Sequence, residues 1–192
     1  MCFRGVVCLM AVMGMFSKAL AKDGNLLLSK DAHAFFTIAL AHDAIPAERT
    51  PAAQLQKYLR LVTGADFVIQ DENDVPADKP QIVVGAGQRA KGLPPQEDWV
   101  ALGTDGIVIK TIDGNLILAG GQARGTLYAV FQFLEETVGC QWWTSTEQFI
   151  PKVTELSIPL QNVRYVPHIS YREHFSTRVR YHPEFATRTL FC

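Results

Sequence analysis

The sequence predicts an α+β fold, in which a mixed β-sheet carries two main helices packed on it. Two stretches place apolar residues at helical spacing, and short apolar runs typical of strands lie before, between and after them. An Asp-Gly pair separates two of those runs, which indicates a hairpin within the sheet. Helices interspersed with strands and a hairpin favour one sheet with helices on its surface.

The chain opens with a segment that does not belong to this fold. Arg4 precedes an apolar run, residues 5–16, and Ala19-Leu20-Ala21 offers a small-x-small cleavage motif. This layout is typical of a secretory signal peptide, residues 1–21, and predicts a secreted or periplasmic protein. The apolar run is too short to span a membrane, so no membrane attachment is expected after cleavage.

The first part of the remaining chain predicts two strands and a helix. The strands are expected at 26–28 and 35–41, where apolar residues dominate. Thr50 suits an N-cap, Pro51 suits the first helical position and Gly64 suits the C′ position, so a helix is predicted over 51–63. Its apolar face is formed by Ala52, Leu55, Tyr58, Leu59 and Val62.

Further strands are predicted in the middle of the chain, at 66–70, 81–85, 106–112 and 115–119. The last two flank Asp113-Gly114, a strong hairpin signal. The second long helix is expected at about 122–138, with an apolar stripe of Leu127, Val130, Phe131, Leu134 and Val138. Short strands are expected in "CQWWT", "EQFIP" and "ELSIPL".

Glycines crowd the turn before the second helix and raise the question of a phosphate site. A P-loop needs a lysine directly after its second glycine, but Thr126 follows Gly125. The favoured interpretation is structural: Gly120, Gly121, Arg124 and Gly125 form a turn that lets the helix pack closely on the sheet.

A second glycine pair, Gly85-Ala86-Gly87, formally matches a dinucleotide fingerprint that ends at Ala90. That site needs a full helix after the turn, whereas Gly92, Pro94 and Pro95 limit any helix to about one turn. No acidic residue ends a second strand where the fingerprint requires one. We therefore expect no nucleotide cofactor, and no other cofactor is predicted.

The order of these segments resembles the N-terminal domain of bacterial alpha-glucuronidases and beta-N-acetylhexosaminidases. The resemblance covers about residues 45–175, and its most specific part is "DGIVIKTIDGNLILAGGQARGTLYAVFQFLE". It implies a non-catalytic accessory domain over 22–165, followed by a TIM-type barrel that hydrolyses glycosidic bonds. The truncated start of that barrel is expected at 166–192, because a whole barrel takes about 250 residues.

The segment "PHISYREHF", residues 167–175, resembles the entry into the first barrel strand. The resemblance implies that Arg172, with Glu173 beside it, binds substrate, because a guanidinium can hold two sugar hydroxyls or a uronate carboxylate. Alternatively, Arg172 pairs with Glu173 or another carboxylate at a domain junction. The expected partners are the downstream barrel and, in addition, glycans.

Other chemistry receives little support. The acidic clusters at 71–74, 97–98 and 135–136 fit a solvated surface better than a catalytic pair, so no catalytic residue is predicted. The histidines lack the spacing of a helical zinc site, and no metal is expected. The net charge of -1 and the absence of basic runs argue against nucleic-acid binding.

Two local features remain open. Trp142 and Trp143 are expected on opposite sides of a strand, one in the core and one exposed, for domain docking or for stacking on a sugar. Cys140 either pairs with Cys192 or is a buried thiol. Two functions follow: an accessory domain of an exported glycoside hydrolase-like protein, or a carbohydrate-binding or adhesive module without catalysis.

Overall fold

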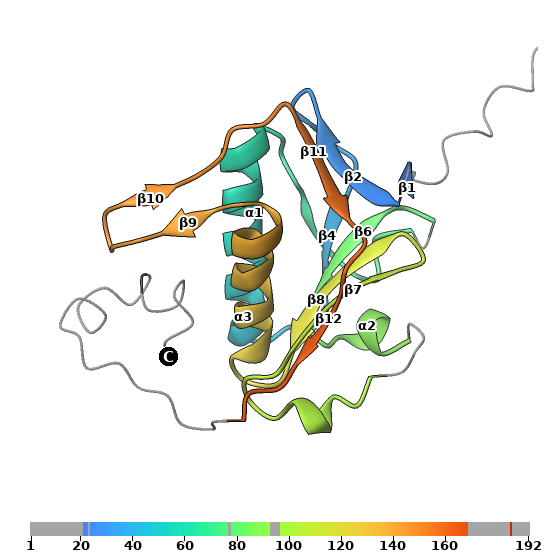
Figure 1. The fold of residues 1–192 in the computed structure, drawn as a ribbon. Coiled ribbons are helices and arrows are strands. Elements are labelled where there is room, and N and C mark those ends of the chain that lie inside the picture. The colour runs from blue at the N-terminus through green and yellow to red at the C-terminus, as the bar shows by residue number, and fades with distance from the viewer. Residues whose placement is uncertain (1–20, 23, 77, 93–96, 169–184, 186–192) are drawn as a thin grey trace, which may run out of the picture.

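The computed structural model describes residues 21–22, 24–76, 78–92, 97–168 and 185. In this part of the chain the fold is α+β, with helices packed on a mixed sheet, as the sequence predicts (Figure 1). The expected signal peptide lies outside the described residues except for Ala21. The expected barrel start lies outside them except for residues 166–168 and Phe185. Both remain predictions.

The main sheet of the described residues has six strands. In spatial order they are β12 (Asn162–Tyr165), β7 (Ile107–Ile112), β8 (Asn115–Gly120), β6 (Gln81–Val84), β4 (Thr37–Leu40) and β5 (Ile69–Asp71). Strands β5, β4, β6 and β8 run parallel to one another, whereas β7 is antiparallel to both of its neighbours, β8 and β12. The predicted hairpin is confirmed, with positive φ of 49° at Asp113 and 78° at Gly114.

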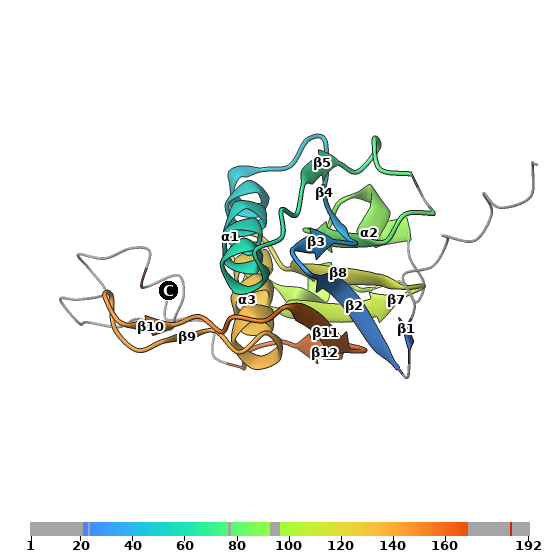
Figure 2. The same cartoon turned by 90° about the horizontal axis from the view of Figure 1, so that it is seen from above.

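Two smaller sheets lie beside the main one. The first joins β1 (Ala21–Lys22), β2 (Asn25–Lys30), β3 (His33–Ala34) and β11 (Glu155–Pro159). The second is a hairpin of β9 (Gln141–Trp142) and β10 (Gln148–Phe149) that projects past the helices in both views (Figures 1 and 2). We call this hairpin and its turn, residues 141–149, the arm.

Helices cover both faces of the main sheet. Helices α1 (Pro46–Thr63) and α3 (Gly125–Gln132) lie side by side on one face, and a π-helical turn η2 (Phe133–Thr137) continues α3 (Figures 1 and 2). The short α2 (Gln88–Gly92) lies on the other face. A 3₁₀ turn η1 (Val100–Leu102) precedes β7.

The core follows the alternation of the strands. On the face covered by α1 and α3, Ile38, Ile82, Ile109 and Leu118 pack in the larger cluster. On the other face, Ala39, Val83, Ile117 and Ala119 pack with Ala90 of α2. Because helices or loops cover both faces, β6 is buried along its whole length, which explains the apolar run of residues 82–84 within it.

Both predicted helices exist, but each begins elsewhere than expected. Helix α1 begins at Pro46 rather than Pro51, because Ile45 is extended and its N–H donates to the Glu48 carboxylate at 3.3 Å. Pro51 therefore lies in the second turn. Helix α3 begins at Gly125 rather than at 122, since residues 122–124 form a turn.

Several strands differ in extent from the predicted ones, and the described residues contain strands that were not predicted. The strand predicted at 35–41 is shortened to β4, because Phe35 and Phe36 lie outside any strand and β3 precedes them. The strand predicted at 66–70 is shifted to β5. Strand β12, which the sequence analysis did not predict, pairs with β7 from Asn162↔Lys110 to Tyr165↔Ile107. Its weak apolar pattern reflects an edge position, where three of its four residues are exposed.

Candidate functional site

The corner between β8 and α3 is a close contact between backbone segments. Gly120 and Gly125 meet each other and Gly106, so that a Cβ on Gly120 would lie 2.4 Å from the Gly106 oxygen. A Cβ on Gly121 would lie 1.8 Å from the Gly103 oxygen. These glycines are required because no side chain fits between the two segments. This packing is what the structural interpretation of the corner expects, and that interpretation stays a prediction.

Three backbone donors of this corner already have partners within the chain. The Gly121 N–H donates to the Gly106 oxygen at 2.8 Å, and the N–H groups of Arg124 and Gly125 donate to the Thr104 oxygen at 3.2 and 3.0 Å. A phosphate cradle needs such donors directed at an open space. Here the loop before β7 accepts those hydrogen bonds instead.

Arg124 is held in the same way. Its Nε and Nη2 donate to the two carboxylate oxygens of Asp105, both at 2.9 Å, in a bidentate ion pair. Asp105 is 7% exposed and precedes β7, whereas Arg124 is 40% exposed. The ion pair fastens the start of α3 to the loop before β7. The sequence predicts Arg124 in the turn, but no local pattern indicates that Asp105 is its partner.

The second glycine corner, between β6 and α2, surrounds two buried carboxylates. Glu48 is 9% exposed and Glu72 is 5% exposed. A Cβ on Gly85 would lie 2.7 Å from a Glu48 oxygen, and a Cβ on Gly87 would lie 2.8 Å from a Glu72 oxygen. Both glycines therefore make room for acidic side chains supplied by other segments.

These carboxylates accept hydrogen bonds from the amides that a nucleotide would need. The N–H groups of Gln88 and Arg89 donate to the two oxygens of Glu72 at 3.1 and 3.2 Å, and the Ala86 N–H donates to Glu48 at 3.3 Å. The helix that follows has five residues. The loop thus holds internal anions, which agrees with the prediction that it binds no dinucleotide.

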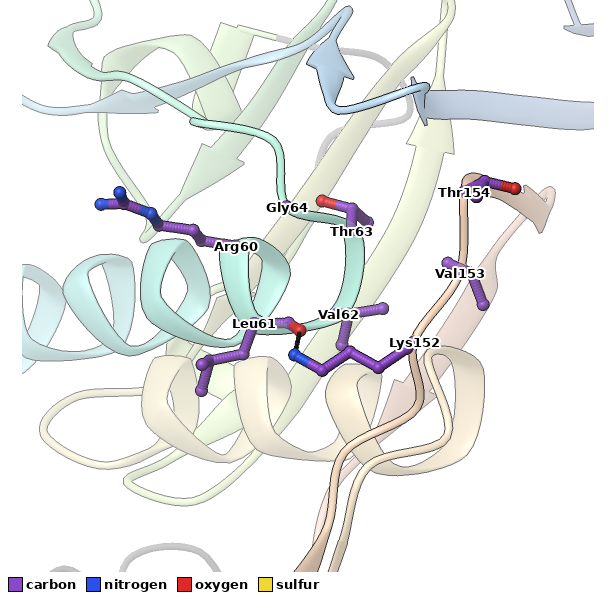
Figure 3. Close-up of a pocket in the computed structure, with 8 residues that line it drawn as sticks. All are labelled: Arg60, Leu61, Val62, Thr63, Gly64, Lys152, Val153 and Thr154. Carbon is purple, nitrogen blue, oxygen red and sulfur yellow. Dashed lines mark hydrogen bonds between the residues drawn. The ribbon is translucent and has the colours of Figure 1, made fainter.

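A depression of about 290 Å³ lies where the C-terminal turn of α1 meets residues 152–154 (Figure 3). The Lys152 ammonium donates to the Leu61 oxygen, and the Val153 N–H donates to the Val62 oxygen at 3.0 Å. These bonds satisfy carbonyls that the end of α1 leaves free. The depression thus lies at a contact in which residues 152–153 cap the C-terminal end of α1.

Titratable groups elsewhere are dispersed. Burial raises the pKa of Glu135, and the adjacent Glu136 charge raises it further. The Asp71 carboxylate accepts hydrogen bonds from Asn73 and His42, which lower its pKa.

Among the described residues, no group of three or more His, Cys, Asp or Glu side chains could hold a metal ion. No helix in the same ranges is long and apolar enough to cross a membrane.

The two tryptophans separate as predicted. Trp142 is 7% exposed and Trp143 is 63% exposed. The Trp142 indole N–H donates to the Tyr58 hydroxyl at 3.2 Å, and its ring meets the rings of Tyr58 and Phe131 edge-on at 5.2 and 5.4 Å. Trp142 therefore anchors the arm to both main helices.

Cys140 is a buried free thiol, and burial raises its pKa to about 12. A thiol so hard to ionise is inert and packs as a small apolar side chain.

The predicted substrate-binding residues Arg172 and Glu173 lie outside the described residues, as does Cys192. The role assigned to Arg172 and Glu173 stays a prediction.

Comparison with known proteins finds similarity among solved structures. No family model matches the sequence, and no curated protein matches it. Among solved structures, a family GH115 4-O-methyl-alpha-glucuronidase, BtGH115A, with specificity for decorated arabinogalactans, is similar with a TM-score of 0.48 and 20% sequence identity. The match covers 77% of this chain and 19% of that chain, so this chain spans about a fifth of its length.

Proposed function

We propose that residues 22–165 form a non-catalytic accessory domain of an exported glycoside hydrolase-like protein that acts on glycosidic bonds in glycans. One observation carries the proposal: both glycine corners are closed by the chain's own groups. Glu48 and Glu72 accept the amides of one corner, and Thr104 accepts those of the other. Both corners that could have held a small ligand therefore serve to support the domain.

The position of the last described strand supports a docking role. β12 is the edge strand of the main sheet, and the chain continues from it toward the predicted barrel. Arg164 of β12 donates to Glu97 at 2.7 Å, and Glu97 also accepts from Lys110 of β7 at 2.8 Å. These bonds fix the strand from which the barrel would start, and Arg172 and Glu173 would contact the sugar there.

The proposal is tested by incubating the full chain with 4-nitrophenyl N-acetyl-β-glucosaminide and with an aldouronic acid. We expect no release of nitrophenol or uronic acid above the uncatalysed rate. Turnover that co-purifies with the folded chain and disappears on thermal unfolding would contradict the proposal. A second measurement joins the chain to the catalytic barrel that the proposal places downstream of it, and docking predicts a higher unfolding temperature for the accessory domain.

A further inference from the structure

The outer side of the arm carries two exposed aromatic rings. In the β9–β10 register, Phe149 lies opposite Gln141 and Gln148 lies opposite Trp142. The Trp143 N–H donates to the Glu147 oxygen at 3.1 Å, which continues the ladder by one residue. Because opposite residues share a face and neighbours alternate, Gln141, Trp143, Glu147 and Phe149 lie together on the face turned away from Trp142.

This face is held in place from behind. Trp142 and its contacts with Tyr58 and Phe131 fasten the base of the arm to the core. Hydrogen bonds from the Thr146 and Glu147 N–H groups to the Thr144 hydroxyl, at 3.2 and 2.9 Å, order its turn. A surface fixed in this way loses little conformational entropy when it binds a ligand.

The chemistry of the face fits a sugar ring. Trp143 is 63% exposed and Phe149 is 51% exposed, on diagonal positions that lie about 7 Å apart in such a pair. A flat aromatic ring matches the apolar C–H face of a pyranose. Gln141 and Glu147 occupy the other diagonal and supply an amide and a carboxylate for hydroxyl groups.

The area and the charge of this face indicate which kind of ligand it can bind. An aromatic side chain offers at most about 250 Å², so two partly exposed rings fall well below the roughly 800 Å² per partner of a stable protein interface. Glu147 is the one charged residue between Gly139 and Pro151. Its carboxylate repels an acidic sugar, and no cation on the arm compensates for this.

We propose that the outer face of the arm binds neutral pyranose glycans by stacking on Trp143 and Phe149. The inference goes beyond the accessory role and does not depend on it, because a stacking face can serve a catalytic or a non-catalytic protein equally. Glycan binding and glycoside turnover are measured separately, so failure of one leaves the other standing.

The test uses the full chain and isothermal titration with cellohexaose, maltohexaose and, as the acidic probe, hexagalacturonate. At least one neutral glycan should bind, with quenching of tryptophan fluorescence, and the acidic glycan should bind more weakly. Trp143→Ala should weaken binding by about tenfold or more, whereas Trp143→Phe should retain most of it. Val100→Ala is the matched control, because Val100 is 91% exposed outside the arm and its loss should leave binding unchanged.

Circular dichroism of each variant verifies that the fold is intact, which is expected because Trp143 is exposed. Three results would overturn the proposal. They are the absence of binding to both neutral glycans at millimolar concentration, equal binding of the acidic glycan, and unchanged binding by a folded Trp143→Ala variant. Self-association that Trp143→Ala abolishes would identify the face as a protein contact instead.

Discussion

Gly121 shows how strictly one position of the chain is determined. A Cβ there would overlap the Gly103 oxygen at 1.8 Å, and that oxygen belongs to backbone that cannot rotate away. Gly121→Ala should therefore lower the free energy of unfolding by about 2–4 kcal/mol. Urea unfolding followed by circular dichroism measures the loss.

Gly92 provides the matched control for this substitution. No atom lies within 4 Å of a Cβ built there, and the residue ends the short helix α2. Gly92→Ala should leave the free energy of unfolding within about 1 kcal/mol of the wild type. If Gly121→Ala proved as mild as this control, the close contact at the corner would be refuted.

Glu72 is a second single residue on which the fold depends, because its carboxylate accepts hydrogen bonds from two backbone amides. Glu72→Ala leaves the amides of Gln88 and Arg89 without their acceptor, which should cost about 2–4 kcal/mol of stability. Added formate should restore part of the unfolding temperature of this variant but not raise that of the wild type. Chloride at equal ionic strength separates binding from a general salt effect.

The comparison variant is Asp43→Ala, in which an exposed carboxylate of the loop before α1 is removed. It should unfold close to the wild type and should not respond to formate. A Glu72→Ala variant that is equally stable would show that the amides do not depend on this carboxylate.

At the scale of elements, Glu97 joins β12 to β7. Burial tends to raise the pKa of Glu97, but hydrogen bonds and charges from Lys110 and Arg164 outweigh it and hold the pKa below its usual range. Glu97→Gln should cost about 1–3 kcal/mol at neutral pH, because hydrogen bonds to a charged group are lost. Hydrogen exchange of β12 amides should rise in this variant.

The pH dependence of this effect has a definite sign. A carboxyl whose pKa is depressed in the folded state stabilises the protein above its unfolded pKa of about 4.3, and the contribution is lost as pH falls through the lower folded value. The difference between wild type and Glu97→Gln should thus shrink below about pH 4.3. A constant difference down to acid pH would contradict the ion-pair account.

Glu135 on η2 differs from Glu97 in that its pKa is raised rather than lowered in the folded protein. Its pKa is raised by burial and then by Glu136, so its charge opposes folding at neutral pH. Glu135→Gln should leave stability at pH 7 unchanged or slightly higher. A loss of stability as large as that of Glu97→Gln would mean that neutralising any carboxyl destabilises this fold.

The helices and strands were predictable from local sequence patterns. The residues at which they begin and end depended on contacts with other segments of the chain. The stripe from Leu55 to Val62 and the hairpin at Asp113-Gly114 are local signals, and the structure confirms both. The true start of α1 required recognising that Glu48 caps Ile45. Strand β12 is specified by pairing with β7 rather than by its own apolar residues, so its sequence gave no signal.

The same distinction applies to the site. The glycine corners were visible in the sequence, and their structural role could be argued from the missing lysine and the short helix. Their partners could not be identified, because Asp105 is 19 positions from Arg124 and Glu48 is 38 positions from Ala86. Only the folded sheet brings these groups together.

On the scale of the whole molecule, the sheet is covered on both faces and the arm extends beyond the helices (Figures 1 and 2). The buried face of the arm belongs to the core through Trp142, while its outer face meets solvent through Trp143. The described residues thus separate a closed interior from the exposed aromatic rings of the arm. The proposed accessory role predicts a separation of this kind.

The central claim is that the strand-to-helix corners are filled by the chain itself. Amide NMR of the full chain, titrated with ADP and separately with pyrophosphate, tests it most directly. We expect no saturable shifts for the amides of residues 85, 86, 88, 89, 121, 124 and 125, because each of them donates to another group of the chain. Saturable shifts confined to either corner would contradict it.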